Sequence, residues 1–454
     1  MRSSIPTLEQ ALAYHHNGHF EQAMDLYHKI LASNPRQADV LNNIGIILQR
    51  FKRDDDALTY FERALESDSA HPPSLFNRGN VLRSLNRHHD AVQSYDQVLQ
   101  SMPNNPEVLN NRGNALRALN RLDDANASYL LALRHAPDYA DARWNASLCL
   151  LLAGQYQQGW QQYEWRWKSE LKAEERAFNQ PLWDGTASLQ SKTILLHAEQ
   201  GFGDTLQFCR YASLVKALGA TVILEVQPPL IKVLAELNGV DVLVARGQAL
   251  PKFDYHCPLL SLPKAFSTEL DSIPATPAYI VSYANRTRIW QARLGAQSKL
   301  RVGLVWTGST THKNDHNRSV PLQALTSIIE QDINFYGLQK ELRDGDRQTI
   351  HQHPQIQYLG KYIKDFTDTA AIISLMDVVI TVDTAIAHLA GAMGKPVWIL
   401  LPYSPDWRWL LGRDDSPWYP TARLFRQPSI GDWSSVMLEV NQALQVLQGQ
   451  HSIG

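Results

Sequence analysis

The sequence has 454 residues, of which 44% are hydrophobic and 19% charged, so it is long enough for about two to four globular domains with ordinary cores. Its formal net charge of −2 argues against a nucleic-acid partner or an anionic membrane surface, because both require a basic excess. The three cysteines lie far apart, which is typical of a reducing compartment without disulfide bonds. The sequence shows no signal-peptide core and no apolar run of about 20 residues, and we therefore expect a cytoplasmic protein that does not insert into a membrane.

A period of 34 residues runs through the first third of the chain. The repeating positions are alanine at Ala23, Ala57, Ala91 and Ala125, glycine at Gly45, Gly79 and Gly113, and an aromatic residue at Tyr27, Phe61, Tyr95 and Tyr129. This spacing is typical of tetratricopeptide repeats (TPRs), in which each unit is a pair of antiparallel helices. A fifth unit keeps the register, so we predict an all-α TPR solenoid over residues 6–167. The concave face of such a solenoid usually binds peptide.

Asparagine also recurs in this register, at Asn43, Asn77 and Asn111. Side-chain amides on the first helix of each repeat can hydrogen-bond the backbone of a bound peptide whatever its sequence. A solvated position, or a polar contact between repeats, explains the same pattern. The sequence leaves these interpretations open.

The repeat pattern stops after Trp167, and a connection over residues 168–191 leads into a region where short apolar strands alternate with helices. The expected strands are Thr193–His197, Thr221–Val226 and Val240–Val244 in a first set, and Arg301–Trp306, Asn334–Leu338, Gln355–Leu359, Val378–Val382 and Val397–Leu401 in a second. The alternation predicts parallel, doubly wound sheets. We assign the two sets to Rossmann-like lobes over residues 192–285 and 286–440, with ligands at the carboxyl ends of the strands.

The loop after the first strand joins two glycines to a carboxylate. Gly201 and Gly203 allow a tight turn and a close approach of a ligand to the backbone. Asp204 falls near the start of the next helix, where a carboxylate either caps the helix or acts as a general base toward an acceptor hydroxyl. The residues alone leave both roles open.

A second candidate segment begins a helix in the second lobe with Asp383, Thr384 and Ala385. Free amides at the start of a helix bind anions and suit a diphosphate, although an ordinary capped crossover helix shows the same pattern. In the polar loop over residues 307–319, Lys313 and Arg318 lie at the expected ligand edge, where cations can neutralise phosphate charge.

The stretch Asp344-Gly345-Asp346 superficially matches a metal-binding Asp-x-Asp motif. It starts a helix instead of following a buried strand, so we interpret it as a solvated turn and expect no metal site.

Several segments together resemble a known family: EQGFGDTLQF, VDTAIAHLAGAMGKPVW, DWRWLL and SPWYP. They look like bacterial TPR-glycosyltransferase proteins, whose catalytic part is similar to the heptosyltransferase-like (family 9) enzymes of the GT-B fold. A more distant similarity is to O-linked N-acetylglucosamine transferases that carry TPRs. The resemblance implies a TPR solenoid followed by an α/β GT-B domain. It also implies a nucleotide-sugar donor as co-substrate, with no cofactor and no metal.

The resemblance also implies roles for individual residues. Asp204, after Gly203, matches the family's putative catalytic base. Donor-binding roles carry over to Gly201, Gly203, Lys313, Arg318, Gln339, Lys340, Asp383, Thr384, Ala385 and His388, although Ala385 replaces the usual glycine and Lys313 is only the nearest counterpart of a phosphate-contacting cation.

The solenoid bears on the acceptor. Heptosyltransferases lack TPRs and modify lipopolysaccharide, so the added repeats shift the expected acceptor toward a polypeptide such as flagellin or another surface protein. We expect Asn43, Asn77 and Asn111 to bind it, and an oligomer is compatible with the sequence. Two alternatives are a non-catalytic TPR adaptor with a degenerate GT-B module and a sugar-nucleotide epimerase. The intact Asp204 argues against the first, and TPRs are hard to explain in an enzyme with only a small substrate.

Overall fold

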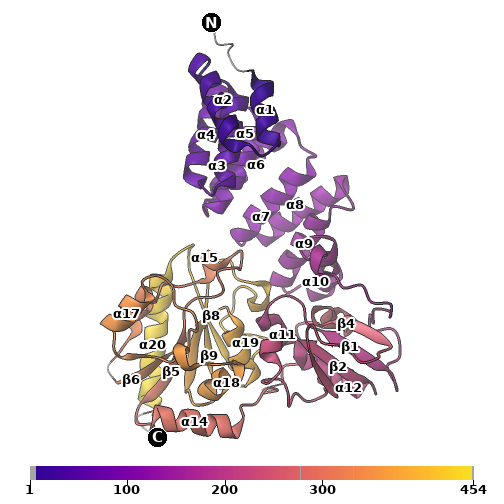
Figure 1. The fold of residues 1–454 in the computed structure, drawn as a ribbon, viewed down its shortest axis with the longest axis vertical. Helices are drawn as coiled ribbons and strands as arrows, with labels where there is room; N and C mark the ends of the chain where they lie inside the picture. The colour runs from indigo at the N-terminus through magenta and orange to yellow at the C-terminus, as the bar shows by residue number, and fades with distance from the viewer. Residues whose placement is uncertain (1–6, 277, 331, 452–454) are drawn as a thin grey trace. The chain divides into compact units, whose positions relative to one another are not determined.

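The computed structural model of the protein describes residues 7–276, 278–330 and 332–451 (Figure 1). It divides into two compact units. The first comprises the described residues up to Cys149 together with Lys168–Glu170, and the second comprises Leu150–Trp167 together with the described residues from Leu171 onward. Within the described residues no helix combines the length and the apolar character needed to cross a membrane.

The first unit is a TPR solenoid, as the 34-residue period predicted. Its helices are α1 Leu8–His16, α2 Phe20–Ser33, α3 Ala38–Arg50, α4 Asp54–Ser67, α5 Pro72–Ser84, α6 His88–Ser101, α7 Pro106–Ala118, α8 Leu122–His135 and most of α9 Ala140–Leu152. Consecutive helices pack as pairs because the repeated glycine leaves room for the repeated ring. A Cβ on Gly45 would lie 2.5 Å from the ring of Phe61, and Gly79 and Gly113 face Tyr95 and Tyr129 in the same way.

The second unit holds two parallel sheets, which confirms the predicted α/β architecture and is consistent with GT-B. The first sheet has the order β3-β2-β1-β4 and the second the order β10-β9-β8-β5-β6-β7. Their strands are β1 Thr193–His197, β2 Thr221–Val226, β3 Val242–Ala245, β4 Tyr255–Pro258, β5 Leu300–Val305, β6 Ile333–Gly337, β7 Ile356–Tyr358, β8 Val378–Val382, β9 Val397–Leu401 and β10 Ala422–Arg426. Central strands such as β5 and β8 are buried along their whole length, because helices cover both faces of a parallel sheet.

Helices connect the strands in both lobes. In the first lobe they are α11 Phe202–Phe208, α12 Ala212–Ala217 and α13 Leu262–Ala265, and α14 Ala284–Leu294 leads to the second. The second lobe contains α15 Asp315–Arg318, α16 Leu322–Leu325, α17 Asp346–Gln352, α18 Phe366–Ser374, α19 Ala385–Ala392 and α20 Trp433–His451. Val436, Val440 and Leu444, spaced by four residues, place one face of α20 in the core of the second lobe.

The two lobes of the second unit meet through α11 and α19, which lie side by side between the sheets (Figure 1). The buried guanidinium of Arg210 joins them again: it donates a 2.7 Å hydrogen bond to the carbonyl of Trp418 and a 2.8 Å bond to the hydroxyl of Tyr279. A buried arginine must satisfy its donors in this way, because unpaired charge in a low-dielectric interior is costly.

The boundary between the compact units lies inside the range 6–167 that the repeat pattern predicted for the first domain. α10, Tyr156–Tyr163, belongs to the second unit. Trp160 of this helix is buried, donates a 3.1 Å hydrogen bond to the carbonyl of Thr268, and packs its ring 5.2 Å from that of Trp407. Part of the predicted linker also packs on the first lobe, where the amide of Trp183 donates to the carbonyl of His256.

Candidate active site

Asp204 lies at the carboxyl edge of the first sheet, in the first turn of α11. Its Oδ2 accepts a 2.9 Å hydrogen bond from the amide of Gly201, so the carboxylate does cap its own helix. Its Oδ1 accepts from Nη2 of Arg408, a residue of the second lobe. An ionised carboxylate offers about four lone-pair positions, so these two bonds leave room for a further donor such as a substrate hydroxyl.

Arg408 is held rigidly beside this carboxylate. It is 7% exposed, and its Nε donates a 2.6 Å bond to Oε1 of Gln207. Its Nη1 donates a 2.9 Å bond to Asp406, and its guanidinium lies 4.3 Å from the ring centre of Trp407. Burial raises the pKa of Asp204, while the charge of Arg408 opposes that rise. The result is a carboxylate that is more basic than an exposed aspartate and that still has a counter-ion.

The sequence suggested that the two glycines of this loop allow a tight turn and the close approach of a ligand, but the structure shows other local causes. The left-handed residue of the turn is Gln200, with φ of 57°, while Gly201 has φ of −82°. Gly203 is needed because α11 packs directly on α19: a Cβ there would lie 2.6 Å from Cδ2 of His388. The close approach that Gly203 allows is therefore that of α19, another part of the protein. The donor-binding roles of Gly201 and Gly203 stay predictions.

The start of α19 faces the same region from the second lobe. Thr384 caps the helix, and its Oγ1 accepts a 3.3 Å hydrogen bond from the amide of Ile386. Ala385, the first residue of the helix, is partly exposed. Burial and then the charge of Asp406 raise the pKa of Asp383 to about 6. The charges of Arg318 and Arg408 act against this rise in the pKa, so the helix start holds both carboxylates and cations.

His388 lies one turn into the same helix. Its Nδ1 lies 2.9 Å from the hydroxyl of Tyr419, and its ring stacks on Trp409 at 5.5 Å. Burial, followed by the charges of Arg408 and Arg210, lowers its pKa well below the ordinary value. The imidazole is therefore neutral at physiological pH and supplies a polar edge instead of a positive charge.

The predicted cations separate into two kinds. Arg318 lies at the helix start: its Nη1 donates a 2.9 Å hydrogen bond to the main-chain carbonyl of Asp383. Lys313 and Lys340 are exposed. The structure therefore brings Arg318 to the α19 start and leaves Lys313 on the loop surface. Gln339 is buried and its Oε1 accepts a 3.2 Å bond from the amide of Thr307, so it fixes the beginning of that loop.

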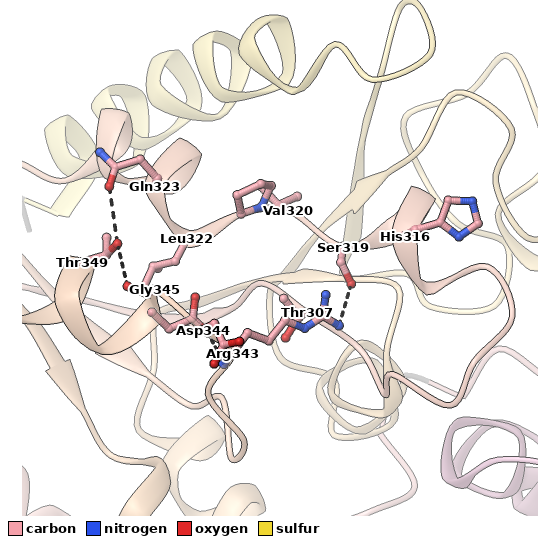
Figure 2. A pocket seen from close by; sticks show the side chains of 12 residues that line it. Thr307, His316, Ser319, Val320, Leu322, Gln323, Arg343, Asp344, Gly345 and Thr349 are labelled. Atoms are coloured by element: carbon pink, nitrogen blue, oxygen red, sulfur yellow. Dashed lines mark hydrogen bonds between the residues drawn. The ribbon is translucent and has the colours of Figure 1, made fainter. Parts of the chain in front are cut away.

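A pocket of about 340 Å³ lies in the second lobe beyond the end of β5 (Figure 2). Its wall is formed by Thr307, His316, Ser319, Val320, Pro321, Leu322, Gln323, Arg343, Asp344, Gly345, Asp346 and Thr349. Figure 2 shows the hydrogen bonds that order this wall, from Thr349 to Gln323 at 3.4 Å and from Arg343 to Ser319 at 3.4 Å. Ligands of doubly wound sheets bind at such strand ends.

The Asp-Gly-Asp turn beside this pocket is only partly solvated. Asp344 is exposed, but Asp346 is 6% exposed, and its Oδ2 accepts hydrogen bonds from Nε1 of Trp306 at 3.1 Å and from the amide of Arg343 at 2.8 Å. The interpretation of the whole stretch as a solvated turn was therefore wrong for Asp346, which anchors the first strand of the lobe to α17.

The asparagines of the repeats make contacts between neighbouring repeats. Nδ2 of Asn77 donates to Asn42 at 2.9 Å, and Nδ2 of Asn111 donates to Asn80 at 3.1 Å. Asn145, in the same register, donates to Asn110 at 3.0 Å. These hydrogen bonds agree with the alternative that the asparagines make polar contacts between repeats. Peptide binding by Asn43, Asn77 and Asn111 stays a prediction.

Sequence reasoning missed Arg408, Asp406 and Gln207. Gln207 lies one turn after Gly203 on α11, in the quoted segment EQGFGDTLQF, but no role was given to it. Asp406 and Arg408 lie in the quoted segment DWRWLL, to which no role was given. Arg408 stands between Trp407 and Trp409 in the sequence, but nothing local shows that it pairs with a carboxylate of the other lobe.

The comparisons with known proteins divide the chain in the same way. Tetratricopeptide repeat families match residues 18–70, 79–116 and 110–163. The glycosyltransferase family 9 (heptosyltransferase) matches residues 344–420, a range that holds Asp383, Thr384, His388 and Arg408. The first part of the chain thus matches tetratricopeptide repeats, and part of the second lobe matches the glycosyltransferase family 9.

The matched part of the family 9 domain does not reach Asp204 or Arg318, so the family resemblance of these two residues rests on the sequence motifs and on their place in the fold. Protein FlbA of Caulobacter vibrioides is 26% identical to this chain over 339 residues, which are 68% of this chain and 55% of FlbA. The chain therefore spans about half the length of this curated relative.

Several solved structures are similar to part of the chain. The crystal structure of MamA is 15% identical, with a TM-score of 0.33, covering 36% of this chain and 97% of MamA. PilF of Pseudomonas aeruginosa is 23% identical, with a TM-score of 0.33, covering 38% of this chain and 75% of PilF. YrrB, described as a TPR protein with an unusual peptide-binding site, is 20% identical, with a TM-score of 0.29, covering 32% of this chain and 74% of YrrB.

Proposed function

We propose that this protein is a metal-independent GT-B glycosyltransferase that moves a sugar from a nucleotide-activated donor to a hydroxyl group on a protein. The family 9 match supports glycosyltransferase activity and a nucleotide-sugar donor. The observation that carries the proposal is the pairing of Asp204 with Arg408 beside the start of α19. It puts a proton acceptor from one lobe next to an anion-binding helix start from the other.

The chemistry follows from these groups. Asp204 takes the proton of the acceptor hydroxyl while the oxygen attacks the anomeric carbon of the donor. The bond between that carbon and the diphosphate oxygen breaks, and the diphosphate leaves with the electron pair. The amides at the start of α19 and the guanidinium of Arg318 stabilise the charge that develops on this leaving group.

The acceptor is assigned to the repeats. A TPR solenoid has a large surface for protein binding and no chemistry of its own, which supports a polypeptide acceptor such as flagellin. We place the reaction in the cytoplasm, a location that agrees with the three free, buried cysteines. Asn43, Asn77 and Asn111 contribute to acceptor binding in this proposal, in exchange for part of their contacts between repeats.

The proposal is tested on the full chain with a panel of nucleotide sugars. A thermal-shift screen identifies the donor, and release of nucleoside diphosphate is then measured with and without a chelator. We expect one donor to raise the melting temperature and to be turned over at the same rate in the chelator. Donor binding without turnover would favour an adaptor, interconversion of the donor sugar would favour an epimerase, and loss of activity in the chelator would contradict metal independence.

A further inference from the structure

The loop that carries Asp204 adopts an unfavourable backbone conformation. Gln200, between the end of β1 and the start of α11, has φ of 57°, in the left-handed region that favours glycine. A residue with a side chain persists there only where the surrounding structure determines its conformation. The position of Asp204 therefore depends on the contacts that hold this loop.

One set of contacts comes from inside the first lobe. Nε2 of Gln227, just after β2, donates a 3.2 Å hydrogen bond to the carbonyl of Gln200. Its Oε1 accepts a 2.8 Å bond from the hydroxyl of Thr205. Gln227 thus connects both ends of the segment that contains Asp204.

The second set comes from the end of the repeat pattern. Nε and Nη2 of Arg166 donate bonds of 2.8 and 2.9 Å to the two carboxylate oxygens of Glu199, and Arg166 is wholly buried. The hydroxyl of Tyr163 accepts a 3.3 Å bond from Nε2 of Gln200. The residues on which the repeat register ends therefore contact two consecutive residues of the Asp204 loop.

α10, the helix that ends at Tyr163, also contacts the segment that carries Arg408. The ring of Trp407, the residue before Arg408, lies 5.2 Å from the ring of Trp160 and 6.1 Å from that of Tyr163. Trp407 also lies under the guanidinium of Arg408 itself. Tyr163 therefore contacts Gln200, which precedes Asp204 in the same loop, and Trp407, which is next to Arg408.

We infer that α10 contributes to catalysis, because its Tyr163 is a positioning residue that aligns Asp204 with Arg408. This inference rests on the proposed function, in which Asp204 is the base. It gives the last aromatic position of the repeat register a different role from the preceding one. The hydroxyl of Tyr129, 34 residues earlier, donates to Asn114 within the repeats at 2.8 Å.

The two tyrosines provide a matched pair of variants in the full chain. Tyr163→Phe removes the hydroxyl and keeps the ring against Trp407, and Tyr129→Phe removes the equivalent hydroxyl from the repeats. We expect Tyr163→Phe to lower kcat for donor turnover about two- to tenfold, as for the loss of one net hydrogen bond, with donor KM little changed. Tyr129→Phe should have the wild-type kcat.

Amide hydrogen exchange provides the second readout, since it does not depend on activity. Tyr163→Phe should speed exchange in residues 201–205 with the melting temperature unchanged, whereas Tyr129→Phe should not affect these amides. If the two variants are alike in both kcat and loop exchange, the positioning role is wrong. If the wild-type protein turns over no nucleotide sugar, the proposed function fails and the exchange comparison alone decides whether Tyr163 orders the loop.

Discussion

Arg408 and Asp204, which are 204 residues apart in the sequence, form a partly buried ion pair that joins the two lobes of the second unit. One partner comes from the segment after β9 and the other from the first turn of α11. Because the pair connects the lobes at the carboxyl edges of both sheets, it fixes the base in the proposed reaction and gives it a counter-ion at the same time.

Replacing Arg408 with glutamine should shift the pH dependence of the reaction. Burial raises the pKa of Asp204 and the arginine opposes it, so removing the positive charge raises that pKa further. A base must be ionised to accept a proton, so the acidic limb of the kcat profile should move to higher pH. Arg413→Gln, which breaks the exposed pair with Asp415, is the control and should leave the limb in place. An unmoved limb in Arg408→Gln would mean that Asp204 does not titrate in the reaction.

Asp383→Asn should stabilise the protein at neutral pH. The folded-state pKa of Asp383, about 6, is above its ordinary value of 3.8, so the native state binds the proton more tightly than the unfolded state. Its contribution to the free energy of unfolding is therefore present at low pH and is lost as pH rises from 3.8 to about 6. Thermal unfolding should show a melting temperature a few degrees above wild type at pH 7.5, with the difference vanishing near pH 4.

Replacing Asp365 with asparagine should change the melting temperature in the opposite direction. Burial works against the shift, but hydrogen bonds from Thr367 and Lys232 lower its pKa to about 2. Asp365→Asn should therefore lower the melting temperature at pH 7.5, with the loss shrinking as pH falls below 3.8. If Asp383→Asn lowered the melting temperature at neutral pH as Asp365→Asn does, the electrostatic description of the α19 start would be incorrect.

Arg318 and Lys313 should differ in donor binding. Arg318 contacts the main chain at the start of α19, and Lys313 is exposed on the preceding loop. We expect Arg318→Gln to weaken binding of the donor's nucleoside diphosphate by about tenfold or more, the loss of a charge-assisted hydrogen bond, and Lys313→Gln to weaken it far less. Isothermal titration calorimetry of the three proteins measures this. If Lys313→Gln weakened binding more than Arg318→Gln does, the diphosphate would bind nearer the loop over residues 307–319 than the start of α19.

Much of this fold could be predicted from the sequence because its signals are periodic. The 34-residue register located the helix pairs, and apolar runs located β1 and β2 to the residue. Two edge strands, β4 and β10, were missed, since Tyr255–Pro258 and Ala422–Arg426 are short or mixed in polarity.

The site was predictable only where it follows strand ends. Asp204, Thr384 and Arg318 could be found because each follows a buried strand or its loop. Arg408 could not, because its importance comes from pairing with a residue of the other lobe. The same holds for Tyr163, which the register marks only as a repeat position. Long-range contacts of this kind leave no local pattern in a single sequence.

The triple variant Asn43→Ala, Asn77→Ala and Asn111→Ala addresses the acceptor. One hydrogen bond contributes about 0.5–1.5 kcal/mol net, so the three together should weaken modification of the protein acceptor by about tenfold or more, while donor hydrolysis is unchanged. Asn77 and Asn111 also join repeats, so the melting temperature must be measured beside the KM for acceptor. Normal modification by a stably folded triple variant would remove these residues from the acceptor site.

The most direct measurement compares wild type with Asp204→Asn in donor turnover. Asparagine keeps an oxygen for the amide of Gly201 but cannot take a proton, so we expect kcat to fall by about 10²–10⁴-fold with binding of the nucleoside diphosphate unchanged. Asp241→Asn, which alters a carboxylate paired with Lys216 before β3, is the control and should keep the wild-type rate. A near-normal rate in Asp204→Asn would reduce Asp204 to a helix cap and contradict the proposed active site.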